Sequence, residues 1–403
     1  MNQPYIDLDK EYGVVLEGGG AKGAYQIGAW KALKECNVKI KGVAGVSVGA
    51  LNGALICMDD VEAAENIWHN ITYSQIMQVD DQEMDSLVNG DLKSIGLPAI
   101  TKKGLKLITD RGIDIAPLRQ LIEECVDEEK IQQSDIQFLL GTLSISDLKE
   151  LELDAKELAP GELKDYLVAS ASLPGFKREK YQGKSYLDGG MVNNVPIDML
   201  VNRGYKDILV IRIYGIGVER KLKLPEDVTL IQIAPRVNLG SILEFSKTKA
   251  RRNIKIGYLD AMRVLKNLQG KIYYLDEVES EEAYGVRFLK MDGAVKMAFL
   301  EYFKDDYSKE QQNYHKFMDI ALPKVAEKLG LDKNWTYQEL YLAMLELAAK
   351  SLRVIKYQIY TVKEFQQEII AHEKKYGERM DTQDLFVKLV IKAVVIDAKK
   401  GEI

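Results

Sequence analysis

Over roughly the first 230 residues, short runs of β-branched and small apolar residues alternate with longer stretches of helical periodicity, and this alternation constrains the fold most. Strands that alternate with helices typically form a parallel sheet covered by helices. The sequence therefore predicts an α/β fold for this part of the chain. The predicted strands cover residues 13–17, 42–46, 138–146, 185–188, 207–213 and 228–233, and helices are expected in most of the gaps.

Beyond about residue 238 glycine and proline become scarce, and apolar residues recur at helical spacing, as from Leu340 to Ala348. This half is expected to be mostly helical, with one strand-like run at 271–275. A chain of 403 residues exceeds what one hydrophobic core usually organises. We therefore expect two domains, 10–238 and 239–403.

The charge and the cysteines limit the class of protein. A formal net charge of -6 gives no basic field that would attract nucleic acid. The three cysteines, Cys36, Cys57 and Cys125, form neither an even disulfide framework nor a C-x-x-C pair, which fits a reducing cytoplasm. The acidic N-terminus does not resemble a signal peptide. The apolar run 385–398 is too short to span a bilayer and is expected to dock on the protein's own core, with an interfacial helix as the alternative.

The first predicted strand leads into a glycine-rich turn, GGGAKG at residues 18–23, followed by a helix predicted at 24–35. Glycines let backbone N–H groups approach an anion closely, and the helix adds its positive N-terminal dipole. The anion is either a cofactor phosphate or the oxyanion of a tetrahedral intermediate. A dinucleotide site also needs an acidic residue at the tip of the second strand. That strand ends at Ser47, and no carboxylate is available there.

The second strand ends in GVSVG at residues 45–49 and is followed by a small, apolar helix. A G-x-S-x-G sequence between a strand and a helix is typical of a nucleophile elbow, with a structural strand–helix turn as the alternative. Both glycine-rich turns follow neighbouring strands of one parallel sheet, so they are expected at the same carboxyl edge. Ser47 is therefore the candidate nucleophile, and the N–H groups of residues 18–20 are candidate donors to an oxyanion.

A serine nucleophile needs a positioned base. The three histidines, His69, His315 and His372, lie in helical stretches and not in a glycine-rich loop after a strand. Asp188, in contrast, is delivered by a short strand into a Gly-Gly turn that is closed by a proline. The alternative for this motif is a structural Asx turn.

Together these residues resemble the patatin-like phospholipases, over about residues 10–215. Three motifs carry the resemblance in the family's order and spacing: GGGAKG at 18–23, GVSVG at 45–49, and DGG at 188–190 followed by Asn193, Asn194 and Pro196. Weaker similarity covers residues 114–123 and 169–175. Lys22 stands where many members of the family carry arginine.

The resemblance implies a three-layer α/β/α fold with a mainly parallel sheet, and a lipid acyl hydrolase that needs no cofactor or metal. Ser47 would attack the acyl carbonyl, Asp188 would take its proton, and the N–H groups of Gly18, Gly19 and Gly20 would stabilise the oxyanion. Residues 10–238 would form the catalytic domain and 239–403 a helical cap or accessory region. The supporting motif residues are Lys22, Gly23, Gly45, Gly49, Gly189 and Gly190.

Two alternatives remain open. One is an α/β-hydrolase triad of Ser47, Asp188 and a downstream histidine, His315 or His372; the other is a non-catalytic module that binds an acyl or anionic ligand. The expected partner is a phospholipid or acylglycerol, the expected location is the cytoplasm, and any membrane contact is expected to be peripheral. The basic residues between Lys247 and Lys255 are expected to form a solvated helix face, with contact to lipid phosphate as the alternative.

Overall fold

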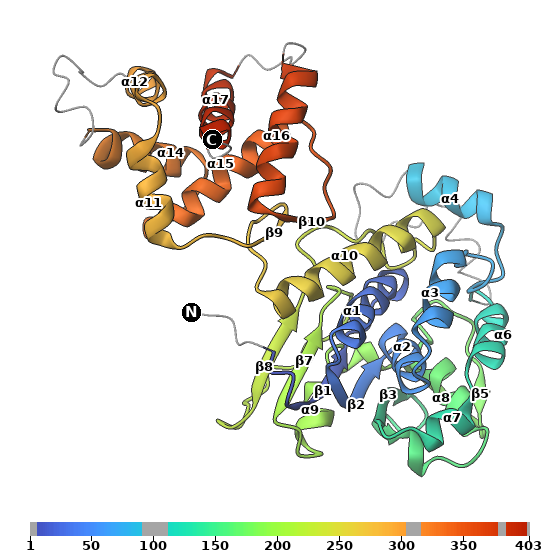
Figure 1. Ribbon diagram of the computed structural model, residues 1–403. Coiled ribbons are helices and arrows are strands. Elements are labelled where there is room, and N and C mark those ends of the chain that lie inside the picture. The colour runs from blue at the N-terminus through green and yellow to red at the C-terminus, as the bar shows by residue number, and fades with distance from the viewer. Residues whose placement is uncertain (1–5, 91–111, 304–315, 378–383, 401–403) are drawn as a thin grey trace. The chain divides into compact units, whose positions relative to one another are not determined.

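The computed structural model describes residues 6–90, 112–303, 316–377 and 384–400 (Figure 1). Its backbone contacts divide the chain into two compact units, Met1–Leu265 and Lys266–Ile403. The boundary expected from sequence lies before helix α10 (Lys247–Lys266), whereas the two units separate at the end of this helix. Each unit is described by itself below.

The first unit is built on an eight-stranded sheet in the order β5-β6-β3-β2-β1-β7-β8, with β4 paired to β3. The pairs among β3, β2, β1, β7 and β8 are parallel, while β4, β5 and β6 pair antiparallel with their neighbours. The predicted α/β fold with a mainly parallel sheet is confirmed. The strands are β1 (Glu11–Leu16), β2 (Lys39–Val46), β3 (Gln137–Ser144), β4 (Lys149–Asp154), β5 (Lys180–Tyr181), β6 (Lys184–Asp188), β7 (Asp207–Ile211) and β8 (Thr229–Ile233).

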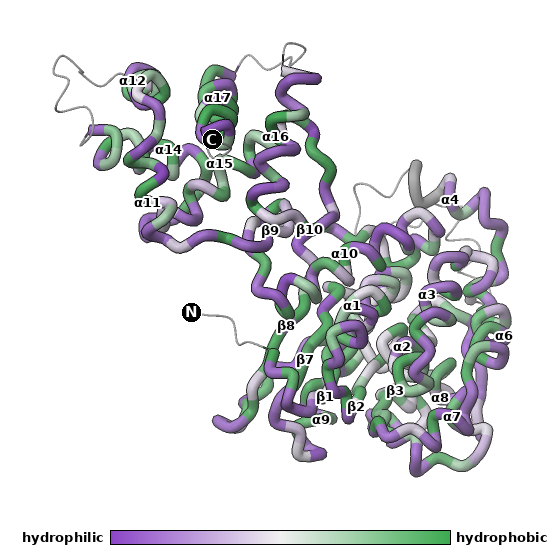
Figure 2. The backbone as a smooth tube through the Cα atoms, in the orientation of Figure 1, coloured by the Kyte–Doolittle hydropathy of each residue, from purple (hydrophilic) through white to green (hydrophobic). Residues whose placement is uncertain are grey.

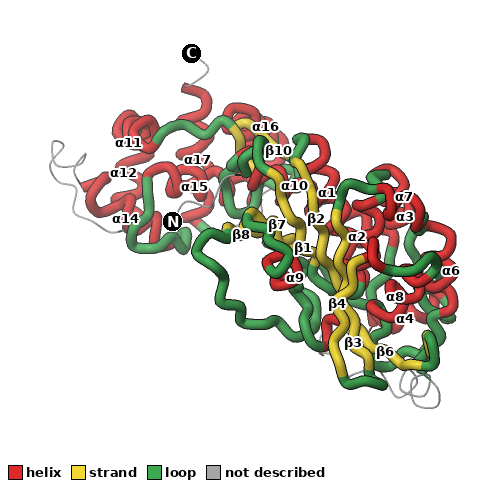
Figure 3. Tube along the Cα trace, turned by 90° about the horizontal axis from the view of Figure 1, so that it is seen from below, coloured by secondary structure: helices red, strands yellow, loops and turns green. Residues whose placement is uncertain are grey.

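Helices cover both faces of the sheet, as expected for three layers (Figure 3). On one face Val15, Ala44 and Leu139 pack against Met199 and Leu200 of helix α9. The other face carries α1 and α2. Because both faces are covered, the central strands are apolar along much of their length, which Figure 2 shows for β1 and β7. The helices of this unit are α1 (Ala24–Glu35), α2 (Val48–Cys57), α3 (Val61–Asn70), α4 (Asp81–Gly90), α6 (Ala116–Cys125), α7 (Glu128–Gln133), α8 (Glu162–Ser170), α9 (Ile197–Val201) and α10.

Helices α1 and α10 cross at two glycines. A side chain at Gly28 would come within 1.8 Å of the carbonyl oxygen of Ile254, and one at Gly257 within 1.9 Å of that of Tyr25. Beside this crossing the Tyr25 hydroxyl donates to the buried Asp260 carboxylate at 3.0 Å. Because these two glycines allow a close approach, helix α10, the first helix after residue 238, packs onto α1 of the α/β unit.

The second unit is mostly helical, as predicted. Its helices are α11 (Glu281–Lys290), α12 (Gly293–Tyr302), α14 (Leu322–Lys328), α15 (Tyr337–Ser351), α16 (Val362–Tyr376) and α17 (Leu385–Lys400). The predicted strand-like run is a strand only from Tyr274, where β9 (Tyr274–Asp276) pairs in parallel with β10 (Ile359–Thr361). Helix α17 buries Val390 and Val394 in the core of this unit, which confirms that the run 385–398 docks on the protein's own core. Within the described ranges, no helix is long and apolar enough to cross a membrane.

Candidate active site

Ser47 stands at the turn between β2 and α2, at the carboxyl edge of the sheet. Its backbone has φ 54° and ψ -131°, a conformation that costs a non-glycine residue about 1–3 kcal/mol. The two flanking glycines make this turn possible, because a side chain at Gly45 would meet the Gly49 carbonyl at 2.3 Å, and one at Gly49 would meet the Leu16 carbonyl at 2.3 Å. The predicted strand–turn–helix context of Ser47 is therefore present.

A second serine, Ser170, holds this turn in place through hydrogen bonds. The Ser47 N–H donates to the Ser170 hydroxyl at 2.9 Å, and that hydroxyl donates to the Gly141 carbonyl at 2.7 Å. Ser170 ends helix α8 and is fully buried. Sequence reasoning missed its role, although it falls in the stretch 169–175 that carries weaker family similarity.

Strand β3 brings Asp188 to the same place. Along this strand Gly141 pairs with Val46, which precedes Ser47, and the next residue, Thr142, pairs with Asp188. The nucleophile candidate and the carboxylate are thus carried by two strands that meet β3 at consecutive positions. Asp188 is 2% exposed, and its Oδ1 accepts the Gly190 N–H at 2.8 Å.

The environment of Asp188 changes its acidity. Burial raises the pKa of this carboxyl from 3.8 to about 6, and the nearby Ser47 hydroxyl and the Gly190 N–H offset part of the rise. The Oδ2 atom is buried and makes no aligned hydrogen bond with the described residues. A carboxylate with a raised pKa and a free oxygen next to a serine hydroxyl can act as a general base near neutral pH, and such pairs often align only when substrate is bound.

The glycine turn after β1 lies against both motifs. The Gly18 N–H donates to the Asn194 carbonyl at 3.1 Å, and the Asn194 side-chain amide donates back to the Gly18 carbonyl at 3.1 Å. This N–H is therefore engaged. The N–H groups of Gly19 and Gly20 have no acceptor among the described residues, nor does that of Val48 at the start of α2. These three groups are the donors available to an oxyanion.

Residues 14–201 match the family described as Patatin-like phospholipase. They belong to the patatin-like phospholipase family. We call residues 14–201 the patatin domain.

Known proteins that are similar to about half of this chain are much longer than it. Neuropathy target esterase sws of Drosophila melanogaster is 28% identical over 214 residues, which cover 49% of this chain and 12% of that protein. Patatin-like phospholipase domain-containing protein 7 of Rattus norvegicus is 27% identical over 202 residues, covering 49% and 13%. This chain therefore spans about an eighth of the length of these relatives. Among solved structures, VipD from Legionella pneumophila aligns over 96% of this chain and 91% of its own, at 14% identity and a TM-score of 0.38.

A buried glutamate holds the glycine turn of the patatin domain in place. The Glu17 carboxylate accepts the Ile213 and Tyr214 N–H groups at 2.7 and 3.0 Å and pairs with Arg212 at 3.0 Å. Lys22 reaches the same loop, because its ammonium group donates to the Tyr214 carbonyl at 2.6 Å. Burial lowers the pKa of this lysine. Lys22 thus fastens the loop after β7 to the turn.

The remaining motif glycines are sites of close packing. A side chain at Gly23 would meet Val48 at 2.3 Å, one at Gly189 would meet the Gly141 carbonyl at 2.4 Å, and one at Gly190 would meet Asn194 at 2.4 Å. These positions therefore require glycine for steric reasons. They bring the three motifs together without themselves offering a reactive group.

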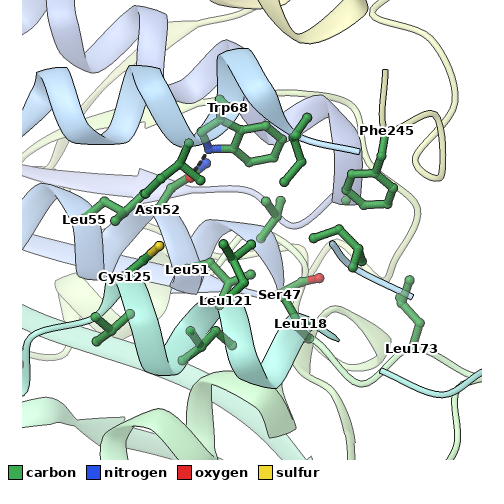
Figure 4. Close-up of a pocket in the computed structure, with 18 of the residues that line it drawn as sticks. Ser47, Leu51, Asn52, Leu55, Trp68, Leu118, Leu121, Cys125, Leu173 and Phe245 are labelled. Carbon is green, nitrogen blue, oxygen red and sulfur yellow. Dashed lines mark hydrogen bonds between the residues drawn. The ribbon is translucent and has the colours of Figure 1, made fainter. Parts of the chain in front are cut away.

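An apolar pocket of about 790 Å³, including its open mouth, runs along helix α2 and past Ser47, with Leu173 and Phe245 on the other side of Ser47 (Figure 4). Leu55 and Cys125 lie at the end away from Ser47. The polar atoms of Asn52 in its wall are satisfied, since this side chain donates to Gly23 and Gln26 and accepts from Trp68. The pocket is lined by Gly20, Ser47, Val48, Leu51, Asn52, Leu55, Ile67, Trp68, Ile71, Ile76, Leu118, Leu121, Ile122, Cys125, Val126, Ala171, Leu173, Phe176, Leu243 and Phe245.

No described histidine hydrogen bonds to Ser47 or Asp188. His69 lies in the last turn of α3, and His372 contacts the Leu352 carbonyl through Nδ1 at 2.9 Å. His315 lies outside the described residues. In the described ranges, no group of three or more His, Cys, Asp or Glu side chains is arranged to hold a metal ion.

Proposed function

We propose that this protein is a serine lipid acyl hydrolase that cleaves fatty-acyl esters of phospholipids or acylglycerols. One observation carries the proposal: the Ser47 hydroxyl lies close enough to the buried Asp188 carboxyl to offset part of the rise that burial causes in its pKa, and Ser47 lines an apolar pocket. Membership of residues 14–201 in the patatin-like phospholipase family supports the same class of reaction.

The reaction needs only groups already described. Asp188 accepts the proton of the Ser47 hydroxyl while the serine oxygen attacks the acyl carbonyl carbon. The resulting oxyanion accepts hydrogen bonds from the N–H groups of Gly19, Gly20 and Val48. Donors of this kind are worth about 2.7–4 kcal/mol each in related sites.

The second half of the reaction restores the enzyme. When the tetrahedral intermediate collapses, the protonated Asp188 gives its proton to the leaving alkoxide, and the acyl group stays on Ser47 as an ester. Asp188 then accepts a proton from water as the water oxygen attacks this ester. Collapse of the second intermediate returns the proton to Ser47 and releases the fatty acid.

The pocket suits an acyl chain. Its lining is almost entirely aliphatic and aromatic, so an alkyl chain there leaves water without desolvating polar groups. We therefore place the acyl chain along α2 and the ester carbonyl at Ser47.

Product analysis by mass spectrometry, with a mixed panel of phospholipids and acylglycerols, tests the proposal. The unchanged chain should release free fatty acid, and Ser47→Ala and Asp188→Asn should each lower turnover by at least about a thousandfold. Loss of turnover on His315→Ala or His372→Ala, with the fold retained, would instead favour a histidine triad. Fluorophosphonate labelling that is equal in the unchanged chain and in Ser47→Ala would favour a non-catalytic module.

A further inference from the structure

The exposed large hydrophobic side chains are unevenly distributed. Eleven such side chains are found among the described residues, and five of them belong to loops next to the candidate active site. Their exposed fractions run from 37% to 55%. We call these five residues the apolar rim: Met191, Tyr214, Ile216, Val218 and Val237.

Sheet topology brings the rim to the edge that holds Ser47. Tyr214, Ile216 and Val218 follow β7, and Val237 follows β8, which are both parallel to β1 and β2. The carboxyl ends of parallel strands meet at one edge of a sheet, so these loops share the edge with Ser47. Met191 comes three residues after Asp188.

Direct contacts fasten the loop after β7 to the catalytic motifs. The Val218 N–H donates to the Gly190 carbonyl at 2.9 Å, and the Val218 carbonyl accepts the Asn194 N–H at 2.7 Å. Gly215 lies so close to the glycine turn that a side chain there would meet the Gly18 carbonyl at 1.8 Å. Since the backbone of this loop is turned inward, its apolar side chains project outward.

The two arginines of this loop are already paired, whereas Lys221 and Lys223 further along it are exposed. Arg212 binds Glu17 and Glu219, and Arg220 binds Glu150 and Asp198. A chain with a net charge of -6 is also not drawn to an anionic surface by its overall field. The rim therefore fits an apolar partner better than a charged one.

We propose that the apolar rim inserts into the surface of a lipid aggregate, such as a phosphatidylcholine bilayer, and so brings lipid to the candidate active site. The inference rests on the proposed function, because the rim borders a site taken to accept acyl chains. Exposed apolar patches commonly mark interaction sites. A substrate held in a bilayer can reach Ser47 only where protein and lipid surface touch.

Vesicle sedimentation tests this inference, with Ser47→Ala in every chain so that the lipid stays intact. Ile216→Asp should weaken partitioning onto phosphatidylcholine vesicles by about tenfold. Ile216→Trp should strengthen it, and its fluorescence should shift to shorter wavelength on binding. Leu289→Asp is the matched control, because Leu289 of α11 is 48% exposed against 55% for Ile216. It should leave partitioning within about twofold of the unchanged chain.

Equal partitioning of Ile216→Asp and the control would overturn the inference. So would binding that occurs only on anionic vesicles and is released by salt. A third contrary outcome is a chain that does not bind vesicles but forms a salt-stable dimer, which Ile216→Asp dissociates. Chains with Ser47 intact separate this inference from the proposed function. Ile216→Asp should lower hydrolysis of vesicle phospholipid at least about fivefold more than hydrolysis of a dissolved short-chain ester. If the unchanged chain cleaves neither substrate, the proposed function fails. The vesicle binding measured with Ser47→Ala still tests whether the apolar rim binds lipid.

Discussion

Asp188 is a carboxylic acid held where water does not solvate its charge. Its pKa of about 6 means that it changes protonation state in the mildly acidic range, whereas an exposed aspartate is already ionised at that pH. A base must be ionised to accept a proton. The pH dependence of the reaction therefore follows directly from the burial of one side chain.

We predict that kcat/KM for a dissolved ester rises about tenfold per pH unit below pH 6 and levels off above it. Initial rates between pH 4.5 and 8, with stability checked at each pH, measure this. A flat profile across this range would contradict the assignment of Asp188 as the base.

The same shift affects stability. The pKa of Asp188 is higher in the folded protein than its ordinary value of 3.8. Protonation of Asp188 therefore stabilises the folded state fully below about pH 4, and this stabilisation is lost as the pH rises to about 6. Asp188→Asn removes the buried charge and keeps an acceptor for Gly190. At pH 8 the free energy of unfolding of the variant should exceed that of the unchanged chain by up to about 3 kcal/mol. At pH 5 the difference should be smaller. Urea unfolding at both pH values measures the difference.

Ser170 offers a second test at the level of single residues. Its hydroxyl joins the strained Ser47 turn to strand β3, so Ser170→Ala should lower kcat about tenfold or more with little change in KM. Ser172→Ala is the matched control, because its hydroxyl bonds only to Val168 within the same segment. Equal effects of the two substitutions on ester turnover would show that the Ser170 contacts do not position Ser47.

Individual site residues differed in how well they could be predicted. Ser47 and Asp188 stand in short motifs, where glycines and a preceding strand mark the local geometry. Ser170 and Asn194 act through hydrogen bonds to residues far away in the sequence, and no local pattern encodes such a partner. For the same reason the engagement of the Gly18 N–H by Asn194 was not foreseen.

At the level of elements, helix α2 forms one wall of the pocket. Val48, Leu51, Asn52 and Leu55 line it at helical spacing, so the wall runs about 12 Å from Ser47 to Leu55. An extended alkyl chain with bonds of about 1.5 Å advances about 1.25 Å per bond. A chain of about nine or ten carbons therefore reaches the far end of the pocket.

We predict that Leu55→Trp shortens the preferred acyl chain and that Leu55→Ala lengthens it. Turnover of a series of p-nitrophenyl esters from four to sixteen carbons measures the preference. The two substitutions control each other, since a general loss of stability would lower turnover at all lengths alike. An unchanged chain-length profile in both variants would remove the acyl chain from this pocket.

The strands show why elements were predicted unevenly. All six predicted strands are present, and β1, β2, β3 and β7 among them contain the buried apolar runs that made them easy to predict. Strand β4 was missed: it lies at the periphery, alternates charged residues with leucine, and lacks β-branched side chains. Its strand conformation depends on pairing with β3, which local composition does not reveal.

For the whole molecule, backbone contacts divide the chain into two compact units, and the domain bounds 10–238 and 239–403 stay a prediction. Periodicity identified the second unit as helical. It did not reveal that α10 packs onto α1 through Gly28 and Gly257, because a glycine in a helix gives no sign of what approaches it. The accessory role of residues 239–403 stays a prediction.

Strand β3 pairs along one edge first with β2 and then with β6, and this register has a kinetic consequence. Two segments distant in the sequence must both find β3 before Ser47 and Asp188 can meet, and contacts between distant segments form slowly. On dilution from denaturant, esterase activity should therefore return later than the far-ultraviolet circular dichroism of the helices, as stopped-flow measurements would reveal. Enzymatic turnover would then report when the last strand has joined the sheet.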